Sequence, residues 1–452
     1  MNSKTRRPPA PSGHPIIGHT FEFARSPFGF VDRATDVCGD VYRLVLPSAE
    51  IYGLAHPDYF RQALVTEVDS FGKTPDFQRV FGNGVLSTEG DQWRRQRGIL
   101  QPLFHRNQIR GYSEYMVGAT QRRLGTWVSG ETRDIESEMQ DLTLEILFST
   151  LFGRDLQPGE GADLRAASIG LNKWFEPTSW LLPNWVPTPS RREYEHSAER
   201  LRTEVRQLLS EYDTDSESEA GPQPDSLHRE TLLSKLHGAL EASGQDHLSM
   251  EEVEDQMLTM IFAGYETTAA ALGFAWYSLA RNPDIRQAFH DELDTVLDGK
   301  PPTQDDVADL DLTNRIVTET LRLYPSIHTI PRQTTRDVQV GDYVIPANEE
   351  VHLSIISVHR DERFYDDPLE FKPDRWTGEL EEKLPDHAFI PFGGGRRTCI
   401  GREFACLEAM LVLATIGQHW TLDWAGEDPR ITIEPEITTK TKNGLPMRIR
   451  QR

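Results

Sequence analysis

The sequence predicts a mostly helical fold with a minor β-sheet component, and three observations support this prediction. Helical periodicity dominates the chain from about Asp91 to Leu323, and short alternating segments lie on either side of that region. One helix within it is apolar on nearly every face. Because such a helix must be buried, we expect it to cross the middle of a single large domain.

The N-terminal region is expected to begin as an extended arm. Prolines are frequent in residues 1–12, so we predict a flexible arm there and one domain over residues 13–452. Alternating segments at Val41–Val45 and Ile51–Leu54 then predict strands. Residues 1–30 contain no apolar run that would form a signal peptide or span a bilayer, so we expect a cytoplasmic, monomeric protein.

Helical spacing predicts the elements that follow, near Asp91–His105, Tyr112–Val128, Ile135–Phe152, Arg191–Tyr212 and Arg229–Ala242. The apolar helix is expected to run from about Ser249 to Arg281. Ser249 and Glu252 form a capping box at its start, and Asn282-Pro283 ends it.

Two connecting segments have unusual compositions. Residues 213–226 are acidic and contain glycine and proline, which predicts a mobile, solvated connection. Residues 174–187 contain three tryptophans, and a pair of leucines between prolines. This segment is either a hydrophobic lid or a loop packed on the core.

The last third of the chain returns to short strands. We expect strands at Val338–Ile345 and Val351–Ile356, followed by a long irregular stretch from Asp361 to Pro391. A final helix is expected over about Arg402–His419, before terminal strands.

The charge balance is strongly acidic. The 452 residues include 71 acidic and 48 basic residues, which gives a net charge of −23, and only nine of the basic residues are lysine. Such a surface repels nucleic acid and anionic lipid, so neither is an expected partner. The composition resembles that of proteins from salt-loving archaea; the alternative is an acidic protein from an ordinary host.

The three cysteines are Cys38, Cys399 and Cys406. So low and odd a number argues against a disulfide framework and for a reducing compartment. We expect Cys38 and Cys406 to be buried small apolar residues.

Cys399 follows three consecutive glycines in the segment from Phe392 to Gly401. Glycines let a backbone turn tightly and pass close to a flat, bulky group. A helix is expected to start near Gly401-Arg402, and its N-terminus, together with Arg397, would stabilise a thiolate.

A thiolate in this setting has three main uses. No histidine lies near it in the sequence to activate it as a nucleophile, although a partner from elsewhere in the fold is possible. No second cysteine or histidine stands at zinc-ligand spacing. A lone axial ligand to haem iron fits the segment best.

Phe392, Gly395, Arg397, Cys399 and Gly401 match the haem-binding signature of the cytochrome P-450 family at every fixed position. The resemblance covers essentially the whole chain and implies that family's fold, with haem b as the cofactor. It implies Cys399 as the metal ligand and four further haem contacts from this segment, at Phe392, Gly393, Arg397 and Gly401.

The segment from Ala263 to Thr268 interrupts the apolar helix with an acid and two threonines. Polar groups inside an apolar helix are costly unless they have partners. The Thr267 hydroxyl can bond the Ala263 carbonyl and bend the helix, and Gly264 weakens the same turn. The segment resembles the family's oxygen-activation motif, which implies that Ala263 borders the haem, that Thr267 donates to bound dioxygen and that Glu266 relays protons.

Further resemblances concern the arginines. Glu319 and Arg322 resemble the family's buried ion pair, and the segment with Arg375 resembles the part that completes the network; their implied role is to fix the cysteine loop. Trp93 and Arg97, four residues apart on one helix, would bond a haem propionate, as would Arg332 and Arg397. For His328 and His359, an active-site position and ordinary packing are both open.

The resemblance implies a haem-thiolate monooxygenase that inserts one oxygen atom into a C–H or C=C bond of an apolar substrate and reduces the other to water. Fatty acids, terpenoids and carotenoids fit the apolar segments expected to form the pocket. The chain has no room after the cysteine motif for a redox domain, so a separate ferredoxin or flavodoxin is the expected electron donor. A candidate docking patch for it comprises Arg94, Arg95, Arg106, Arg396 and Arg402.

Two rival classes remain. A haem-thiolate sensor or electron carrier would keep Cys399 but would not need Glu266 and Thr267. A peroxide-driven peroxygenase of the family would be expected to replace that acid–threonine pair, which is intact here.

Overall fold

The computed structural model describes residues 6–47, 49–175, 186–217, 231–428 and 430–452. The chain falls into two compact units, which are described separately. The first unit comprises Met1–Pro75, Arg315–Cys399 and Arg430–Asn443; the second comprises Asp76–Asn314, Ile400–Pro429 and Gly444–Arg452.

The first unit is built on a five-stranded sheet. Its strands, in spatial order, are β1 (Val41–Val45), β2 (Glu50–Leu54), β8 (Glu350–Ser354), β5 (Thr329–Thr334) and β3 (Phe71–Gly72). All neighbouring pairs are antiparallel except β2 and β8, which are parallel. Tyr52, Leu54, Val351 and Leu353 are completely buried and form the centre of this unit's apolar core.

Two of the predicted strands are shorter than expected. The segment Val338–Ile345 is a hairpin of β6 (Val338–Val340) and β7 (Tyr343–Ile345), because Gly341, with φ 54°, lies in a tight turn between them. The strand predicted at Val351–Ile356 ends at Ser354, and the chain continues as α16 (Ile355–His359).

The N-terminal arm lies along this unit wherever it is described. The Arg6 carbonyl accepts a hydrogen bond from the Val344 amide at 3.0 Å, and the Pro9 carbonyl accepts one from the Arg43 amide at 2.8 Å. The single domain over residues 13–452 remains a prediction.

Short helices complete the first unit: α1 (Thr20–Arg25), α2 (Pro27–Cys38), α3 (Pro57–Arg61), the π-helix η1 (Gln62–Thr66) and α17 (Glu379–Lys383). Helix α15 (Asp311–Leu323) begins in the second unit and lies mostly in the first. A small pair of strands, β10 (Ile433–Pro435) and β11 (Thr439–Thr441), also belongs here. Most of Asp361–Pro391 is irregular, as predicted.

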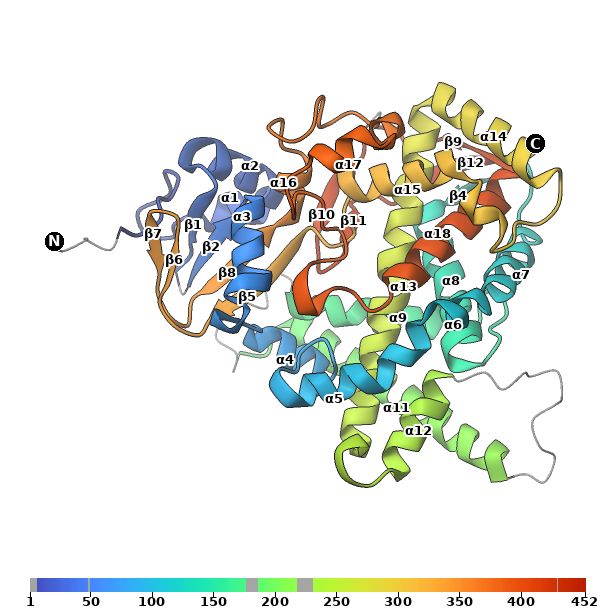
Figure 1. Ribbon diagram of the computed structural model, residues 1–452, viewed down its shortest axis with the longest axis horizontal. Coiled ribbons are helices and arrows are strands. Elements are labelled where there is room, and N and C mark those ends of the chain that lie inside the picture. Colours follow the sequence, from blue (N-terminus) through green and yellow to red (C-terminus); the bar gives the residue numbers. More distant parts are fainter. Residues whose placement is uncertain (1–5, 48, 176–185, 218–230, 429) are drawn as a thin grey trace. The chain divides into compact units, whose positions relative to one another are not determined.

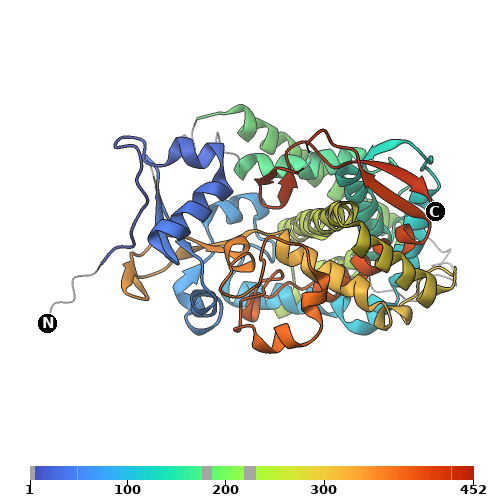
Figure 2. The ribbon, with the colours of Figure 1, turned by 90° about the horizontal axis from the view of Figure 1, so that it is seen from above.

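The second unit is arranged around α13 (Met250–Arg281), the long helix labelled in Figure 1. Ser249 and Glu252 form the predicted capping box, and Asn282 caps the C-terminus before Pro283. Nearly every residue from Val253 to Leu279 is buried, and α8 (Ile135–Leu147) packs along the helix. Figure 2 views α13 nearly along its axis, with other helices of its unit around it.

The remaining helices of the second unit are α4 (Pro75–Phe81), α5 (Gly90–Leu100), α6 (Arg106–Arg110), α7 (Ser113–Leu124), α9 (Ala162–Leu171), α11 (Pro189–Glu217), α12 (Leu232–Glu241), α14 (Pro283–Leu297) and α18 (Arg402–Gly417). Two predicted helices change type before their predicted ends. Helix α5 continues as the 3₁₀ helix η3 (Gln101–Phe104), and α8 continues as the π-helix η4 (Phe148–Phe152). Strands β4 (Thr132–Asp134), β12 (Pro446–Gln451) and β9 (Trp420–Trp424) form a sheet.

The two unusual connections fall partly outside the described residues. Helix α11 extends to Glu217, so the predicted mobile connection was wrong at its N-terminal end; residues 218–230 lie outside the described part of the chain. Of the tryptophan-rich segment, residues 176–185 also lie outside it, and Trp174 is buried. Within the described ranges, none of the helices combines the length and apolarity needed to cross a bilayer.

Candidate active site

The cysteine loop of the first unit depends on glycine for its path. Gly393 and Gly395 have φ values of 71° and 64°, a region that side chains disfavour. A Cβ atom on Gly395 would lie 2.1 Å from the Leu64 carbonyl oxygen. At Gly393, by contrast, the nearest atom to such a Cβ is a methyl of Ile330, at 3.8 Å. The loop is therefore closely packed against Leu64 at Gly395, whereas Gly393 has space for a side-chain atom.

Backbone hydrogen bonds fix the loop that carries Cys399. The Gly393 amide donates to the Ile390 carbonyl at 2.9 Å, and the Cys399 amide donates to the Phe392 carbonyl at 3.0 Å. Cys399 is exposed, so its sulfur is accessible to a ligand. The other two cysteines, Cys38 and Cys406, are only half-buried, so the prediction that they are buried was wrong.

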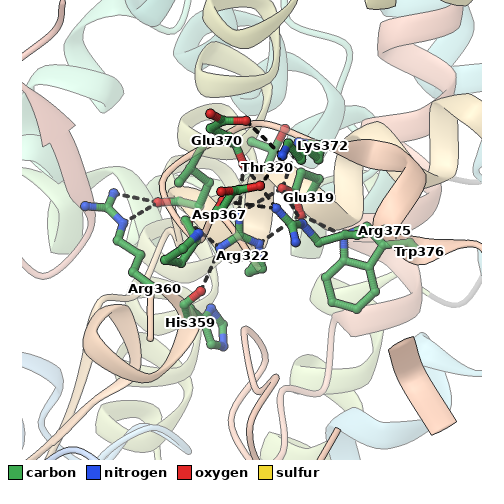
Figure 3. Close-up of polar contacts among 12 residues, drawn as sticks. Glu319, Thr320, Arg322, His359, Arg360, Asp367, Glu370, Lys372, Arg375 and Trp376 are labelled. Carbon is green, nitrogen blue, oxygen red and sulfur yellow. Dashed lines mark hydrogen bonds and ion pairs between the residues drawn. The ribbon is translucent and has the colours of Figure 1, made fainter. Parts of the chain in front are cut away.

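A buried ion-pair network lies in the same unit as this loop (Figure 3). Glu319 and Arg322 are completely buried and pair at 2.8 Å, as predicted. Glu319 also accepts hydrogen bonds from Arg375 Nε at 3.0 Å and from Trp376 Nε1 at 2.8 Å. A buried carboxylate is tolerated only when paired and fully hydrogen-bonded, and these donors meet that requirement.

His359 connects the network to the cysteine loop. Arg322 Nη1 donates to the His359 carbonyl at 2.8 Å, and the His359 Nε2 atom accepts from the Ile390 amide at 3.0 Å. Burial, assisted by the nearby Arg322 charge, lowers the pKa of His359 to about 3, so Nε2 is free to accept. Since Ile390 also anchors Gly393, these contacts give His359 a structural role.

Strand β5 carries the predicted propionate-binding arginine of this unit. Ile330 is the residue that a Cβ atom on Gly393 would meet, and Arg332 lies two residues further on, hence on the same face of the strand. Arg332 is buried, and one of its nitrogens donates to the Pro331 carbonyl at 2.8 Å. His328 precedes the strand, packs edge-on against Phe28 and has a pKa lowered by burial to about 3.

In the second unit, α13 presents the predicted acid–threonine pair. The Thr267 hydroxyl donates to the Ala263 carbonyl at 2.9 Å, as predicted. The helix nevertheless continues unbroken through this turn. A Cβ atom on Gly264 would lie 2.6 Å from a Leu147 methyl, so this glycine allows α8 to approach closely.

The sequence did not reveal the partner of Glu266. Asn172 Nδ2 donates to Glu266 Oε1 at 3.0 Å and to Oε2 at 3.3 Å. Both residues are buried. Asn172 begins the 3₁₀ helix η5 (Asn172–Phe175), 94 positions away in the sequence, so no local pattern connects the two residues.

Trp93 and Arg97 lie one turn apart on α5, as predicted, and both are half-buried. Arg97 Nε donates to Gln101 Oε1 at 2.8 Å. The candidate docking arginines are largely engaged: Arg94 pairs with Asp91, Arg95 with Glu252 and Arg396 with Asp69.

The predicted site residues thus form two sets. The first unit holds Arg332, Phe392, Gly393, Arg397 and Cys399; the second holds Trp93, Arg97, Ala263, Glu266, Thr267 and Gly401. Helix α18 starts at Arg402, three residues after Cys399, as expected. Among the described residues, no group of three or more His, Cys, Asp or Glu side chains could hold a metal ion.

The chain is similar to known proteins of one family. The family model described as "Cytochrome P450" matches residues 8–446. The chain is 32% identical to pentalenene oxygenase of Streptomyces avermitilis, over 95% of this chain and 92% of that protein. It is 30% identical to cyclooctat-9-en-7-ol 5-monooxygenase of Streptomyces melanosporofaciens, over 91% of this chain and 89% of that protein.

The fold also matches a solved structure. The crystal structure of the cytochrome P450DA heme domain superposes with a TM-score of 0.85, at 25% identity, covering 99% of this chain and 98% of that one. The predicted helical fold with minor sheets is thereby confirmed, as are haem b and the haem-thiolate monooxygenase class. The protein is an oxidoreductase that incorporates molecular oxygen.

Proposed function

The chain belongs to the cytochrome P450 family, and on this premise we propose that Cys399 is the thiolate ligand of its haem iron. The observation that carries the proposal is that hydrogen bonds fix the cysteine loop in place. The sulfur is exposed, and the backbone that leads to it is tied through Ile390 and His359 to the buried Glu319–Arg322 pair. This arrangement holds one thiolate in a fixed place.

When bound, the haem supplies the iron centre at which dioxygen is reduced and activated, and thiolate ligation favours cleavage of the O–O bond. The arginines Arg97, Arg332 and Arg397, with Trp93, would bind the haem propionates, because guanidinium groups pair well with carboxylates. Phe392, Gly393, Ala263 and Gly401 would border the macrocycle, where small and apolar residues permit close approach.

Glu266 and Thr267 would transfer protons to the active site. Glu266 is a buried carboxyl group that can hold a proton, and Thr267 carries a hydroxyl that can pass one on. The two residues are adjacent on α13, so Glu266 would pass a proton to Thr267 for delivery to the site.

We propose an apolar terpenoid as the substrate, hydroxylated or epoxidised by insertion of one oxygen atom. The names of the relatives support this class, since pentalenene is a hydrocarbon and cyclooctat-9-en-7-ol carries a single hydroxyl group. The aromatic residues Phe77, Phe81, Phe175 and Phe262 of the second unit pack into an apolar wall. Phe77 and Phe175 are half-buried and would contact such a molecule, whereas Phe81 and Phe262 are buried behind them.

A separate ferredoxin or flavodoxin would supply the electrons, docking on the exposed arginines that include Arg94. A cytoplasmic location, a monomeric state and an origin in a salt-loving organism remain predictions from the sequence. The last of these follows from the net charge of −23 and is tested below through salt dependence.

The absorption spectrum of the reduced, carbon monoxide-bound holoprotein tests the ligand assignment. A strongly red-shifted Soret band is expected for the native chain and for the Cys406→Ser control, because both retain the thiolate. Cys399→Ser is expected to lose that band. A native spectrum typical of histidine ligation, or a red-shifted band that survives Cys399→Ser, would refute the assignment.

A further inference from the structure

Asn172 is a hydrogen-bond donor to the carboxyl group of Glu266. Its Nδ2 atom lies 3.0 Å from one carboxyl oxygen and 3.3 Å from the other, so one amide group spans both. Asn172 is 2% exposed and Glu266 is 1% exposed. A hydrogen bond given to a buried carboxylate favours its charged form and restricts its rotation.

The segment that carries Asn172 is anchored to α4 as well. Trp174 Nε1 donates to Asp76 Oδ1 at 3.0 Å, and the Arg79 guanidinium lies over the Trp174 ring at 4.8 Å. Helix η5 is therefore fastened at two points, to α13 through Asn172 and to α4 through Trp174. A displacement of α4 would reach Glu266 through this one turn of helix.

Asn172 and Phe175 lie on the same side of η5, because residues three apart coincide in a 3₁₀ helix. The Phe175 ring contacts Phe77 with centroids 5.7 Å apart, and Phe77 contacts Phe81 at 5.6 Å. Phe81 in turn contacts Phe262 of α13 at 5.2 Å. One face of η5 thus contacts both the aromatic wall and the acid.

We propose that Asn172 is the positioning residue for Glu266, and that η5 couples contact of an apolar substrate with the aromatic wall to the placement of this acid. The inference rests on the proposed function, in which Glu266 handles protons. Asn172 touches no reacting atom; it acts by fixing the direction of the carboxyl group. A substrate that shifts Phe175 would tighten or release that hold.

A double-mutant cycle on the purified holoprotein tests the first part. Asn172→Leu keeps the volume but removes the donor, and Glu266→Gln keeps the shape but removes the charge. At neutral pH we expect Asn172→Leu to raise the unfolding constant about tenfold more with Glu266 present than in the Glu266→Gln background.

Two further variants distinguish positioning from packing. Asn172→Gln retains an amide donor and should recover part of the coupling, whereas Leu171→Ala, a buried neighbour on α9, should destabilise equally in both backgrounds. Equal costs of Asn172→Leu with Glu266 and with Gln at that position would overturn the proposal, because Asn172 would then only fill space.

The coupling to the aromatic wall has its own test. Phe175→Ala leaves Asn172 and Glu266 in place but loosens η5, so we expect the measured coupling to fall several-fold; an unchanged value would overturn this part. All variants are also checked by the carbon monoxide spectrum, which reports Cys399 alone. Loss of the thiolate band in the native chain would refute the proposed function, whereas loss of the coupling alone would refute only the present inference.

Discussion

Two buried carboxyl groups of the second unit differ in their hydrogen bonding. Glu266 receives a hydrogen bond from Asn172, whereas Glu408 of α18 is 1% exposed and neither of its oxygens has a hydrogen-bond partner among the described residues. The Thr268 hydroxyl lies near Glu408. Burial raises the pKa of Glu408 well above its ordinary value of 4.5, so folding favours the neutral form of this group.

This difference predicts the pH dependence of stability. Because the folded pKa of Glu408 is raised, the folded state keeps a proton that the unfolded state releases, and stability falls as the pH rises from about the unfolded value towards the folded one. Glu408→Gln cannot ionise, so at mildly alkaline pH its free energy of unfolding should be about 1–3 kcal/mol higher than that of the native chain. Near pH 4 the two should be similar. Urea unfolding at both pH values measures this, and an equal gap at both would contradict it.

At the level of single residues, the sequence predicted those sites whose role depends on a local pattern. Cys399 and its glycines are fixed by turns within ten residues, and Thr267 bonds Ala263 within one helical turn. The Asn172–Glu266 contact joins residues 94 positions apart on separate helices. Such a contact depends on how α9 and η5 pack on α13, which no spacing within the sequence encodes.

At the level of elements, the helix ends predicted most accurately were those marked in the sequence by a capping box or a proline. Helix α13 begins at a capping box and ends before a proline, and both ends were predicted to within one residue. The hairpin β6–β7 was predicted as one strand because its alternating apolar residues continue on both sides of Gly341. Helix α5 was predicted too long because the change to a 3₁₀ helix at Gln101 leaves the apolar spacing almost unaltered.

Helix α5 also carries the exposed arginines expected to receive the electron donor, and the structure decides which of them is the better probe. The Arg94 side chain is 64% exposed and pairs with an exposed aspartate, whereas Arg95 pairs with Glu252, whose side chain is only 12% exposed. Reversing Arg95 would place two acids together and disturb the fold. Arg94→Glu should alter the surface alone.

We therefore expect Arg94→Glu to slow reduction by a bacterial ferredoxin or flavodoxin by roughly three- to tenfold at low salt, because a repulsive charge at the rim of an interface acts mainly on the association rate. Stopped-flow reduction under carbon monoxide measures the rate. Arg200→Glu on α11, another partly exposed arginine in an ion pair, serves as the control and should have little effect. Equal rates for the native chain and Arg94→Glu would place the docking surface elsewhere.

For the whole molecule, the net charge of −23 is the property most open to test. Like charges on one surface repel, and this repulsion opposes the compact state. Dissolved salt screens it, since the Debye length falls from about 30 Å at 0.01 M to about 3 Å at 1 M. Ion pairs of the surface are screened as well, but each contributes little to stability.

The melting temperature should consequently rise by several degrees between low salt and molar KCl, as repulsion among the 71 acidic residues is screened. Thermal unfolding followed by circular dichroism measures the rise. Sucrose, which favours compact states without screening charge, is the control and should produce a smaller increase. If KCl leaves the melting temperature unchanged or lowers it, favourable ion pairs outweigh the repulsion and the acidic surface is not an adaptation to salt. A clearly larger rise in KCl than in sucrose would support an origin in a saline cell.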